Sequence, residues 1–334
     1  MFRAWVNPRI RASPQWRENP AALAVLRPRP PRRPYGNYHQ TGLRIPLLSP
    51  ALWSVAACST IYLGCAAYDV YRASLRAKAR ESRWPSRQNP MFEDLEYSNE
   101  DEKTNRMWRN IDSERPEFAD SAGVNRLVLG TIAVTIGAHV ASRAIPSIMP
   151  FFVHTPLLSP NYTLLSSVFG HSGLIHLGLN MYVMFPLMPV VAQADTFREN
   201  PAHLAAFYLS TGILSSLAQH VTAVWPRPNP FASSLGASGV LYALFGVVGV
   251  SFPDAQVSII LLPGSFPIAQ VLACVALFDA IGIFVKYPFL NLGHASHLSG
   301  LALGAAYATY GGNEKIWRPG RKLAFKAMRS VGLL

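Results

Sequence analysis

A serine flanked by glycines is the first candidate for chemistry. The motif Gly236-Ala237-Ser238-Gly239 begins an apolar segment and follows a loop-like stretch at 226–234. A serine in the first turn of a helix lies beside backbone N–H groups that have no partner within the helix, and beside the positive end of the helix dipole. Both features can stabilise an oxyanion. Small-residue clusters in membrane helices also serve close packing, so this motif alone leaves both interpretations open.

A histidine near the start of the last apolar segment is the candidate base. His297 lies one turn before Gly300 within the segment that runs from His294 to Gly304. Gly300 and Gly304 form a GxxxG face that allows another helix backbone to approach, and His297 lies on the same side. Its imidazole could therefore reach the serine as a general base. We interpret His294 as a helix-end histidine at the water interface.

Further polar residues share one face of an earlier segment. His176 and Asn180 are four residues apart, so a helix presents an imidazole and an amide to the same point, and His171 precedes them. Together with the Ser238 backbone N–H, these donors could complete an oxyanion hole. A structural hydrogen-bond network between helices is the alternative. A nucleophile, a base and two oxyanion donors on three apolar segments are, however, hard to explain by packing alone.

These residues must be held by helices that cross a membrane. Half of the 334 residues are hydrophobic and 14% are charged, against about 25% in soluble domains. Residues 47–68 carry no charge and are numerous enough to cross a hydrocarbon core. Six further apolar segments follow, at about 126–144, 171–192, 203–223, 236–252, 267–286 and 293–311. The sequence therefore predicts an all-α polytopic membrane protein with one extra N-terminal transmembrane helix before a six-helix core (1+6).

The positive charge lies at the two ends of the chain. Residues 1–45 contain nine arginines and one acid, residues 312–334 contain six basic residues and one acid, and the whole chain has a net charge of +12. This distribution favours targeting and membrane-flank roles over nucleic-acid binding. We therefore divide the chain into a mitochondrial transit peptide or basic disordered tail (1–45), the extra transmembrane helix (46–68), a polar connector (69–123), the six-helix core (124–311) and a basic C-terminal tail (312–334).

In this order, the three motifs resemble those of the rhomboid intramembrane serine proteases, which carry HxxxN in one span, GxSG in a second and a histidine followed by small-residue spacing in the last. The resemblance covers about 124–311. It implies Ser238 as nucleophile, His297 as general base and acid, and His176 with Asn180 as oxyanion donors. It also implies supporting positions, namely Gly236, Gly239, Tyr242, His171, Gly300 and Gly304, with Tyr242 packed against the catalytic imidazole. The family works with a Ser–His dyad, so we assign Asp279, in a different helix, a structural role.

Within that family the mitochondrial (presenilin-associated rhomboid-like) branch is the closer resemblance. The grounds are the transit-like N-terminus, the extra span, an Asp in the penultimate span and the segment 294–300, HASHLSG, which is similar to that branch's HAAHLGG. Ser299 replaces the first glycine of HLGG, so the helix contact at that point is expected to be less close.

The resemblance implies a serine endopeptidase of the mitochondrial inner membrane that cleaves membrane-anchored proteins in or near their transmembrane segment. It implies substrates such as a dynamin-like GTPase of mitochondrial fusion or an imported peroxidase, and no metal or other cofactor. Three alternatives stay open: a catalytically inactive rhomboid-like protein that binds membrane clients, a polytopic transporter and a membrane haem protein with paired histidines. No HExxH sequence occurs, which argues against a metalloprotease. The three cysteines lack CxxC spacing, which argues against a disulfide scaffold or a zinc finger.

Overall fold

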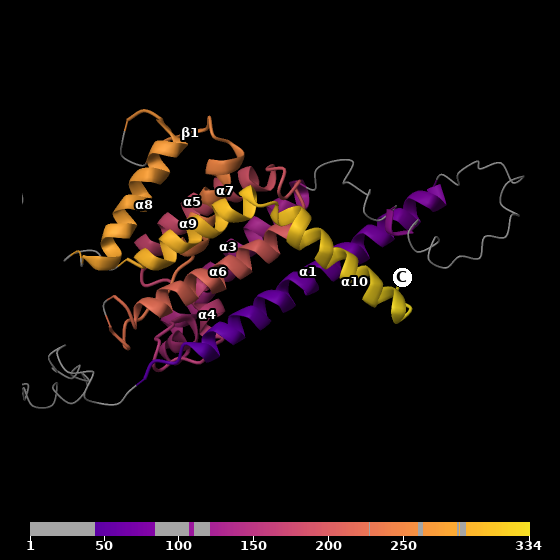
Figure 1. Ribbon diagram of the computed structural model, residues 1–334. Coiled ribbons are helices and arrows are strands. Elements are labelled where there is room, and N and C mark those ends of the chain that lie inside the picture. The colour runs from indigo at the N-terminus through magenta and orange to yellow at the C-terminus, as the bar shows by residue number, and fades with distance from the viewer. Residues whose placement is uncertain are drawn as a thin grey trace, which may run out of the picture. The chain divides into compact units, whose positions relative to one another are not determined.

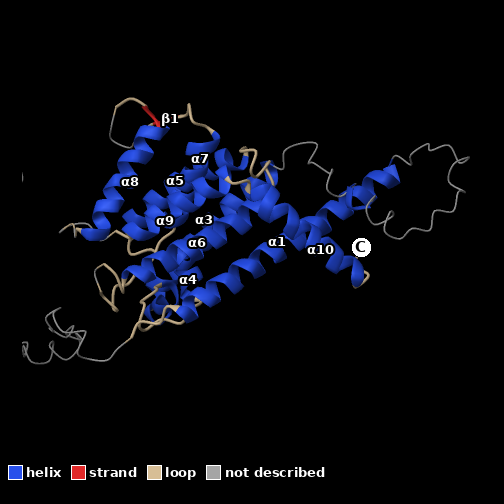
Figure 2. Cartoon of the chain, viewed as in Figure 1, coloured by secondary structure: helices blue, strands red, loops and turns tan. Residues whose placement is uncertain are grey.

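The described part of the chain is almost entirely helical, which confirms the all-α class (Figures 1 and 2). The structure is a computed structural model that describes residues 44–83, 107–109, 121–226, 228–259, 263–285, 287 and 292–334. The predicted transit peptide and most of the predicted connector lie outside the described residues. Residues 45–334 form one compact unit.

Long helices occupy all seven positions where the sequence predicts an apolar segment. In the described residues the long helices are α1 (Leu48–Arg83), α3 (Ser121–Ala144), α5 (Leu174–Ala192), α6 (Pro201–Thr222), α7 (Ser238–Ser251), α8 (Ile268–Phe284), α9 (His294–Thr309) and α10 (Arg318–Ser330). Shorter helical turns are η3 (Pro146–Phe152), α4 (Thr163–Ser166), η4 (Ser167–Phe169) and η5 (Asn313–Trp317). Strands β1 (Gln256–Val257) and β2 (Phe266–Pro267) pair antiparallel, with Gln256 opposite Pro267.

Three of these helices are long and apolar enough to cross a membrane by length and composition. They lie at Leu48–Ala79, Ser121–Ala144 and Leu174–Ala192, whereas α7 and α8 are apolar but shorter. Helix α6 is long but buries polar side chains, among them His203, Ser215 and His220. The chain is therefore a polytopic helical protein, and the number of seven crossings stays a prediction.

Helix α1 continues well beyond the predicted end of the extra span at 68. Residues 69–83 contain no Gly or Pro and are rich in Ala and Arg, which favour helix. Val70 and Ala73 are buried against Phe325 of α10, and Arg321 of α10 forms an ion pair with Asp69 at 2.7 Å. The first part of the predicted connector and most of the predicted C-terminal tail are thus two helices that pack on each other (Figure 1).

The core lies where α5, α6 and α7 meet. Met184 and Met188 of α5, Phe207 of α6 and Leu244 of α7 are fully buried in one cluster. Helix α9 packs along α7, while α8 packs mainly on α9 at the edge of the bundle (Figure 1). The three motif-bearing segments are therefore neighbours in space, with α7 between α5 and α9.

Candidate active site

Ser238 is the first residue of α7, and the backbone turns into this helix at a glycine two residues earlier. Gly236 has a φ of +126°, a conformation that side-chain-bearing residues rarely adopt. Its N–H donates to the Ser167 carbonyl at 2.9 Å. A Cβ on Gly236 would lie 2.8 Å from Cε1 of His176. Glycine is therefore required here both for the backbone turn and for the space that the His176 ring occupies.

The loop before Ser238 forms backbone hydrogen bonds with the segment that follows η3. His154 and Ser234 exchange two backbone hydrogen bonds, of 3.0 and 2.8 Å. The His154 ring is fully buried and lies 2.8 Å from the ring of His220, whose Nε2 donates to the Pro46 carbonyl at 2.7 Å. Burial and the neighbouring His220 ring lower the pKa of His154 to about 4. His154 is therefore neutral at neutral pH. Through His220 of α6 it connects the loop before Ser238 with the residues that precede α1.

Ser238 and His297 lie within hydrogen-bonding distance. The Ser238 hydroxyl donates to Nε2 of His297 at 2.8 Å. The ring of Tyr242, one turn after Ser238, stacks on the His297 imidazole with centroids 4.3 Å apart and an interplanar angle of 10°. A serine oxygen that donates to an imidazole nitrogen is the arrangement from which a general base can remove the hydroxyl proton.

Asp279, to which the sequence assigns a structural role, lies on the other side of the same imidazole. Its carboxylate is completely buried, and Oδ1 accepts from Nδ1 of His297 at 3.2 Å. With Nδ1 carrying the proton, Nε2 is free to accept from Ser238. Serine, histidine and aspartate therefore form a connected chain across α7, α9 and α8.

His294 begins α9, as the sequence indicates, but it is buried, so its predicted place at the water interface is wrong. Its exposed fraction is 6%, and its Nδ1 donates to the same Oδ1 of Asp279 at 2.6 Å. The ring occupies the space beside Gly282 of α8, where a Cβ would clash with it. The prediction failed because a histidine at the first position of an apolar helix gives no sign that a carboxylate faces it from another helix.

The two candidate oxyanion donors differ in their surroundings. The His176 ring lies where it would meet a Cβ on Gly236, and its Nδ1 lies 3.2 Å from the Ser172 hydroxyl. The Asn180 amide instead donates to the backbone carbonyl of His176 at 2.8 Å, within its own helix. The structure therefore places His176 near the serine, and it gives the Asn180 amide a different partner.

His171 supports the ring of His176. The two rings meet edge to face with centroids 4.9 Å apart. Burial and the neighbouring His176 ring lower the pKa of His171 to about 4, so it is neutral at neutral pH. Two α3 side chains that we did not single out from the sequence hold this segment: His139 donates to the His171 carbonyl at 3.2 Å, and Arg143 donates to the Ser172 carbonyl at 2.7 Å.

Glycines bring α7 and α9 into backbone contact. A Cβ on Gly300 would overlap the carbonyl oxygen of Gly239, and one on Gly304 would overlap that of Ala243. A Cβ on Gly239 would in turn meet the hydroxyl of Ser296. This contact determines how far His297 stands from Ser238. Ser299 does not interrupt the contact, because its hydroxyl donates to the Ser296 carbonyl within α9 at 3.1 Å.

Comparison with known proteins places the site in a recognised domain. Residues 160–314 match the family model described as Rhomboid domain. The chain is 29% identical over 223 residues to "Presenilin-associated rhomboid-like protein, mitochondrial" of Homo sapiens, which covers 64% of this chain and 53% of that protein. It is 33% identical over 153 residues to "Presenilin-associated rhomboid-like protein A, mitochondrial" of Danio rerio, covering 46% and 38%.

A fungal relative matches as well. "Rhomboid protein 1, mitochondrial" of Saccharomyces cerevisiae is 27% identical over 173 residues, which covers 50% of this chain and 48% of that protein. The chain thus spans about half the length of the curated relatives it matches. The resemblance to rhomboids, and to those named mitochondrial, is confirmed.

Proposed function

We propose that the chain, whose residues 160–314 match the family model described as Rhomboid domain, is an intramembrane serine endopeptidase that cleaves membrane-anchored proteins in or near their transmembrane segment. The observation that carries this proposal is the 2.8 Å hydrogen bond from the Ser238 hydroxyl to Nε2 of His297. A protein that only binds membrane clients has no need for this contact. The Asp279 carboxylate behind His297 strengthens the case, because it holds the imidazole in the tautomer that a base requires.

In the proposed reaction, His297 takes the Ser238 proton while the serine oxygen attacks the substrate carbonyl carbon. Asp279 stabilises the imidazolium that forms. The Ser238 backbone N–H, at the start of α7, and His176 stabilise the tetrahedral oxyanion. One of the two N–H donors of the Asn180 amide is bonded to the His176 carbonyl, so Asn180 can contribute only through its second N–H or by leaving that carbonyl.

The proton on His297 then goes to the leaving amine, and the C–N bond breaks to leave an acyl ester on Ser238. Water attacks that ester with His297 again as base, which releases the new carboxyl group and restores the serine. The substrate helix must unwind locally beforehand, because an intact helix holds its carbonyls in internal hydrogen bonds.

We assign the proposed activity to the mitochondrial inner membrane. The relatives with which the chain aligns are named mitochondrial, and three of the described helices are long and apolar enough to cross a membrane. Candidate substrates are membrane-anchored proteins, such as a dynamin-like GTPase or an imported peroxidase, which the family resemblance suggests.

The test compares purified wild type with Ser238→Ala and His297→Ala on a tagged single-span substrate, followed by gel and mass spectrometry. Both variants should lose at least about 10³-fold in cleavage rate. Ser299→Ala is the matched control, because it removes an α9 hydroxyl bonded only within its own helix. A fluorophosphonate probe should label wild type and the control, but not Ser238→Ala. Cleavage that persists in Ser238→Ala would exclude the proposed nucleophile. If wild type neither cleaves nor reacts with the probe, the client-binding relative is favoured.

A further inference from the structure

A buried chain of hydrogen bonds joins four segments around the loop before Ser238. The His154 ring, in the segment after η3, has Nδ1 at 2.7 Å from the Thr163 hydroxyl, at the start of α4. Its Nε2 lies 2.8 Å from Nδ1 of His220 in α6. Nε2 of His220 donates to the Pro46 carbonyl, just before α1, at 2.7 Å. His154, Thr163 and His220 are each at most 1% exposed, so these bonds lie in the protein interior.

The protons of this chain run in one direction. Because a carbonyl oxygen only accepts, Nε2 of His220 carries the proton that bonds Pro46. In the neutral ring, Nδ1 of His220 accepts from Nε2 of His154, and Nδ1 of His154 accepts from the Thr163 hydroxyl. That hydroxyl has the Pro160 carbonyl as a second acceptor at 2.7 Å, but this oxygen also receives the Thr163 N–H at 3.1 Å. Each of the three bonds thus has one donor and one acceptor, which fixes the orientation of both rings.

The loop before the proposed nucleophile takes its position from the same residues. The N–H and the carbonyl of His154 both bond the backbone of Ser234. The second anchor of the loop is the Gly236 N–H, which donates to the Ser167 carbonyl. Ser167 comes directly after α4, the short helix that Thr163 begins. Both anchors of the loop therefore lead back to the hydrogen-bond chain, one through the backbone of His154 and one through α4.

The chain holds as a unit, because breaking one of its bonds leaves a buried nitrogen or oxygen without a partner. We propose that His154 and His220 are positioning residues, which hold the loop before Ser238 in place and couple it to the start of α1. This inference rests on the function proposed above. Both residues act on the reaction through the backbone of the loop, which determines where Ser238 stands relative to His297. The rate depends steeply on that geometry, since a displacement of about 1 Å can lower it about 10²-fold.

The experiment uses the full-length protein in proteoliposomes. It measures kcat and KM on a tagged single-span substrate, the rate of fluorophosphonate labelling, and the midpoint of thermal unfolding. The test variant is His220→Phe, which keeps a ring in the space and removes both nitrogens. His220→Gln is the conservative variant, because one amide supplies both a donor and an acceptor. Thr163→Val removes the first donor of the chain with little change of shape, and it serves if His220→Phe does not fold.

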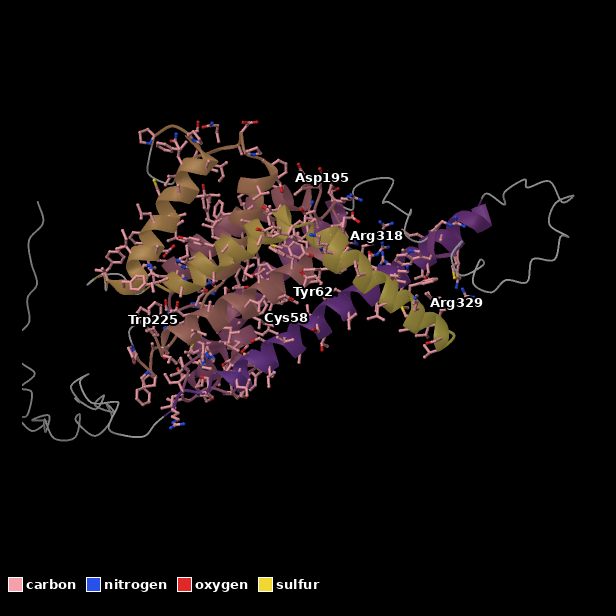
Figure 3. The ribbon with its side chains drawn as sticks, viewed as in Figure 1. Cys58, Tyr62, Asp195, Trp225, Arg318 and Arg329 are labelled. Carbon is pink, nitrogen blue, oxygen red and sulfur yellow. The ribbon has the colours of Figure 1, made fainter. Side chains whose placement is uncertain are left out.

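His203→Phe is the matched control. His203 is a second histidine of α6 that is 1% exposed, and its Nε2 lies 2.7 Å from the Tyr307 hydroxyl. It stands at the other end of the helix, where its ring stacks on Trp317. Figure 3 shows Trp225, which follows α6, and Arg318, which follows Trp317, at opposite ends of the bundle. The control therefore removes an equally buried hydrogen bond far from the loop.

His220→Phe should lower kcat and the labelling rate together, by about 10- to 100-fold, with KM within about threefold of wild type. His220→Gln should recover most of that loss. His154→Phe should resemble His220→Phe, and the double variant should lose no more than about threefold further, since both rings act in one chain. The control should lower the unfolding midpoint and leave kcat within about threefold of wild type.

An equal loss of kcat in the control would assign the effect to general destabilisation and overturn the inference. Wild-type labelling rates in folded His220→Phe, or in Thr163→Val where it replaces that variant, would overturn it as well. In either case a wild type that cleaves and labels leaves the proposed function standing. If wild type itself neither cleaves nor reacts with the probe, the proposed function fails and the positioning role fails with it.

Discussion

The sharpest perturbation is Asp279→Asn, because it preserves the shape of a fully buried side chain and removes only its charge and one acceptor. An amide nitrogen at that position would donate to Nδ1 of His297 and so favour the tautomer whose Nε2 carries the proton. That tautomer cannot accept the Ser238 proton. We therefore expect a loss in kcat with little change in KM.

The magnitude follows from the separation of the two groups. His297 becomes cationic in the transition state, 3.2 Å from the Asp279 oxygen. At an effective dielectric constant of about 20, that pair is worth up to about 5 kcal/mol, or nearly four orders of magnitude in rate. The same oxygen also accepts from His294, at the shorter distance of 2.6 Å, which reduces its charge available to His297. We expect a loss of about 10²- to 10³-fold in kcat.

The assay separates this role from a purely structural one. Steady-state cleavage of a single-span substrate in proteoliposomes gives kcat and KM, and the rate of fluorophosphonate labelling reports on Ser238 without substrate binding. His294→Phe is the comparison, because it removes the donor closest to Oδ1 of Asp279 and leaves His297 in place. The reasoning is refuted if folded Asp279→Asn keeps kcat within threefold of wild type, or if His294→Phe reproduces its whole loss.

Three further outcomes test the packing and the titrating groups. Gly236→Ala should abolish cleavage, since its φ of +126° strains any other residue; a folded, active variant would contradict this. Gly304→Ala should lower the free energy of unfolding by about 2–3 kcal/mol through overlap with the α7 backbone, measured by thermal unfolding against Gly137→Ala, a position with open space around it. Burial and the His220 ring lower the pKa of His154 to about 4. The unfolded chain therefore binds a proton at this imidazole at a higher pH than the folded protein does. The stabilisation from the neutral His154 ring is complete above about pH 6.5 and is lost as the pH falls toward 4. The midpoint of thermal unfolding should fall over that range, and a midpoint independent of pH would be inconsistent with a neutral buried imidazole.

The residues that the sequence identified most readily are those whose local pattern carries the information. Gly236 and Ser238 lie within one four-residue motif. The spacing of Gly300 and Gly304 predicts close helix packing even when the partner helix is unknown. The structure brings Ser238, His297 and Tyr242 together. The positions of the apolar helices were likewise predictable, because each contains a long apolar stretch and most charged residues of the core lie between these stretches.

Features that depend on contacts between distant segments were not predictable in this way. Asp279 and His294 are 15 residues apart and face each other across α8 and α9, so neither residue's sequence neighbourhood signals the pair. A carboxylate within an apolar helix did give one usable signal, because such a group requires a partner. The extension of α1 beyond residue 68 was missed for a related reason: Asp69, Val70 and Ala73 contact α10, which comes from the other end of the chain.

The short length of α7 connects the fold to the proposed chemistry. Its 14 residues rise about 21 Å, which is less than the ~30 Å of a hydrocarbon core. A helix of that length that begins or ends at one surface leaves its other end inside the bilayer. Ser238 lies at the N-terminal end of α7, after a non-helical stretch whose N–H groups are satisfied by protein. The Ser234 N–H donates to the His154 carbonyl and the Gly236 N–H to the Ser167 carbonyl. Irregular backbone is tolerated at membrane depth only where protein or enclosed water meets its polar groups. A serine held there is surrounded by the polar groups that a water-requiring deacylation needs, and an unwound substrate segment would find partners for its exposed carbonyls at the same place.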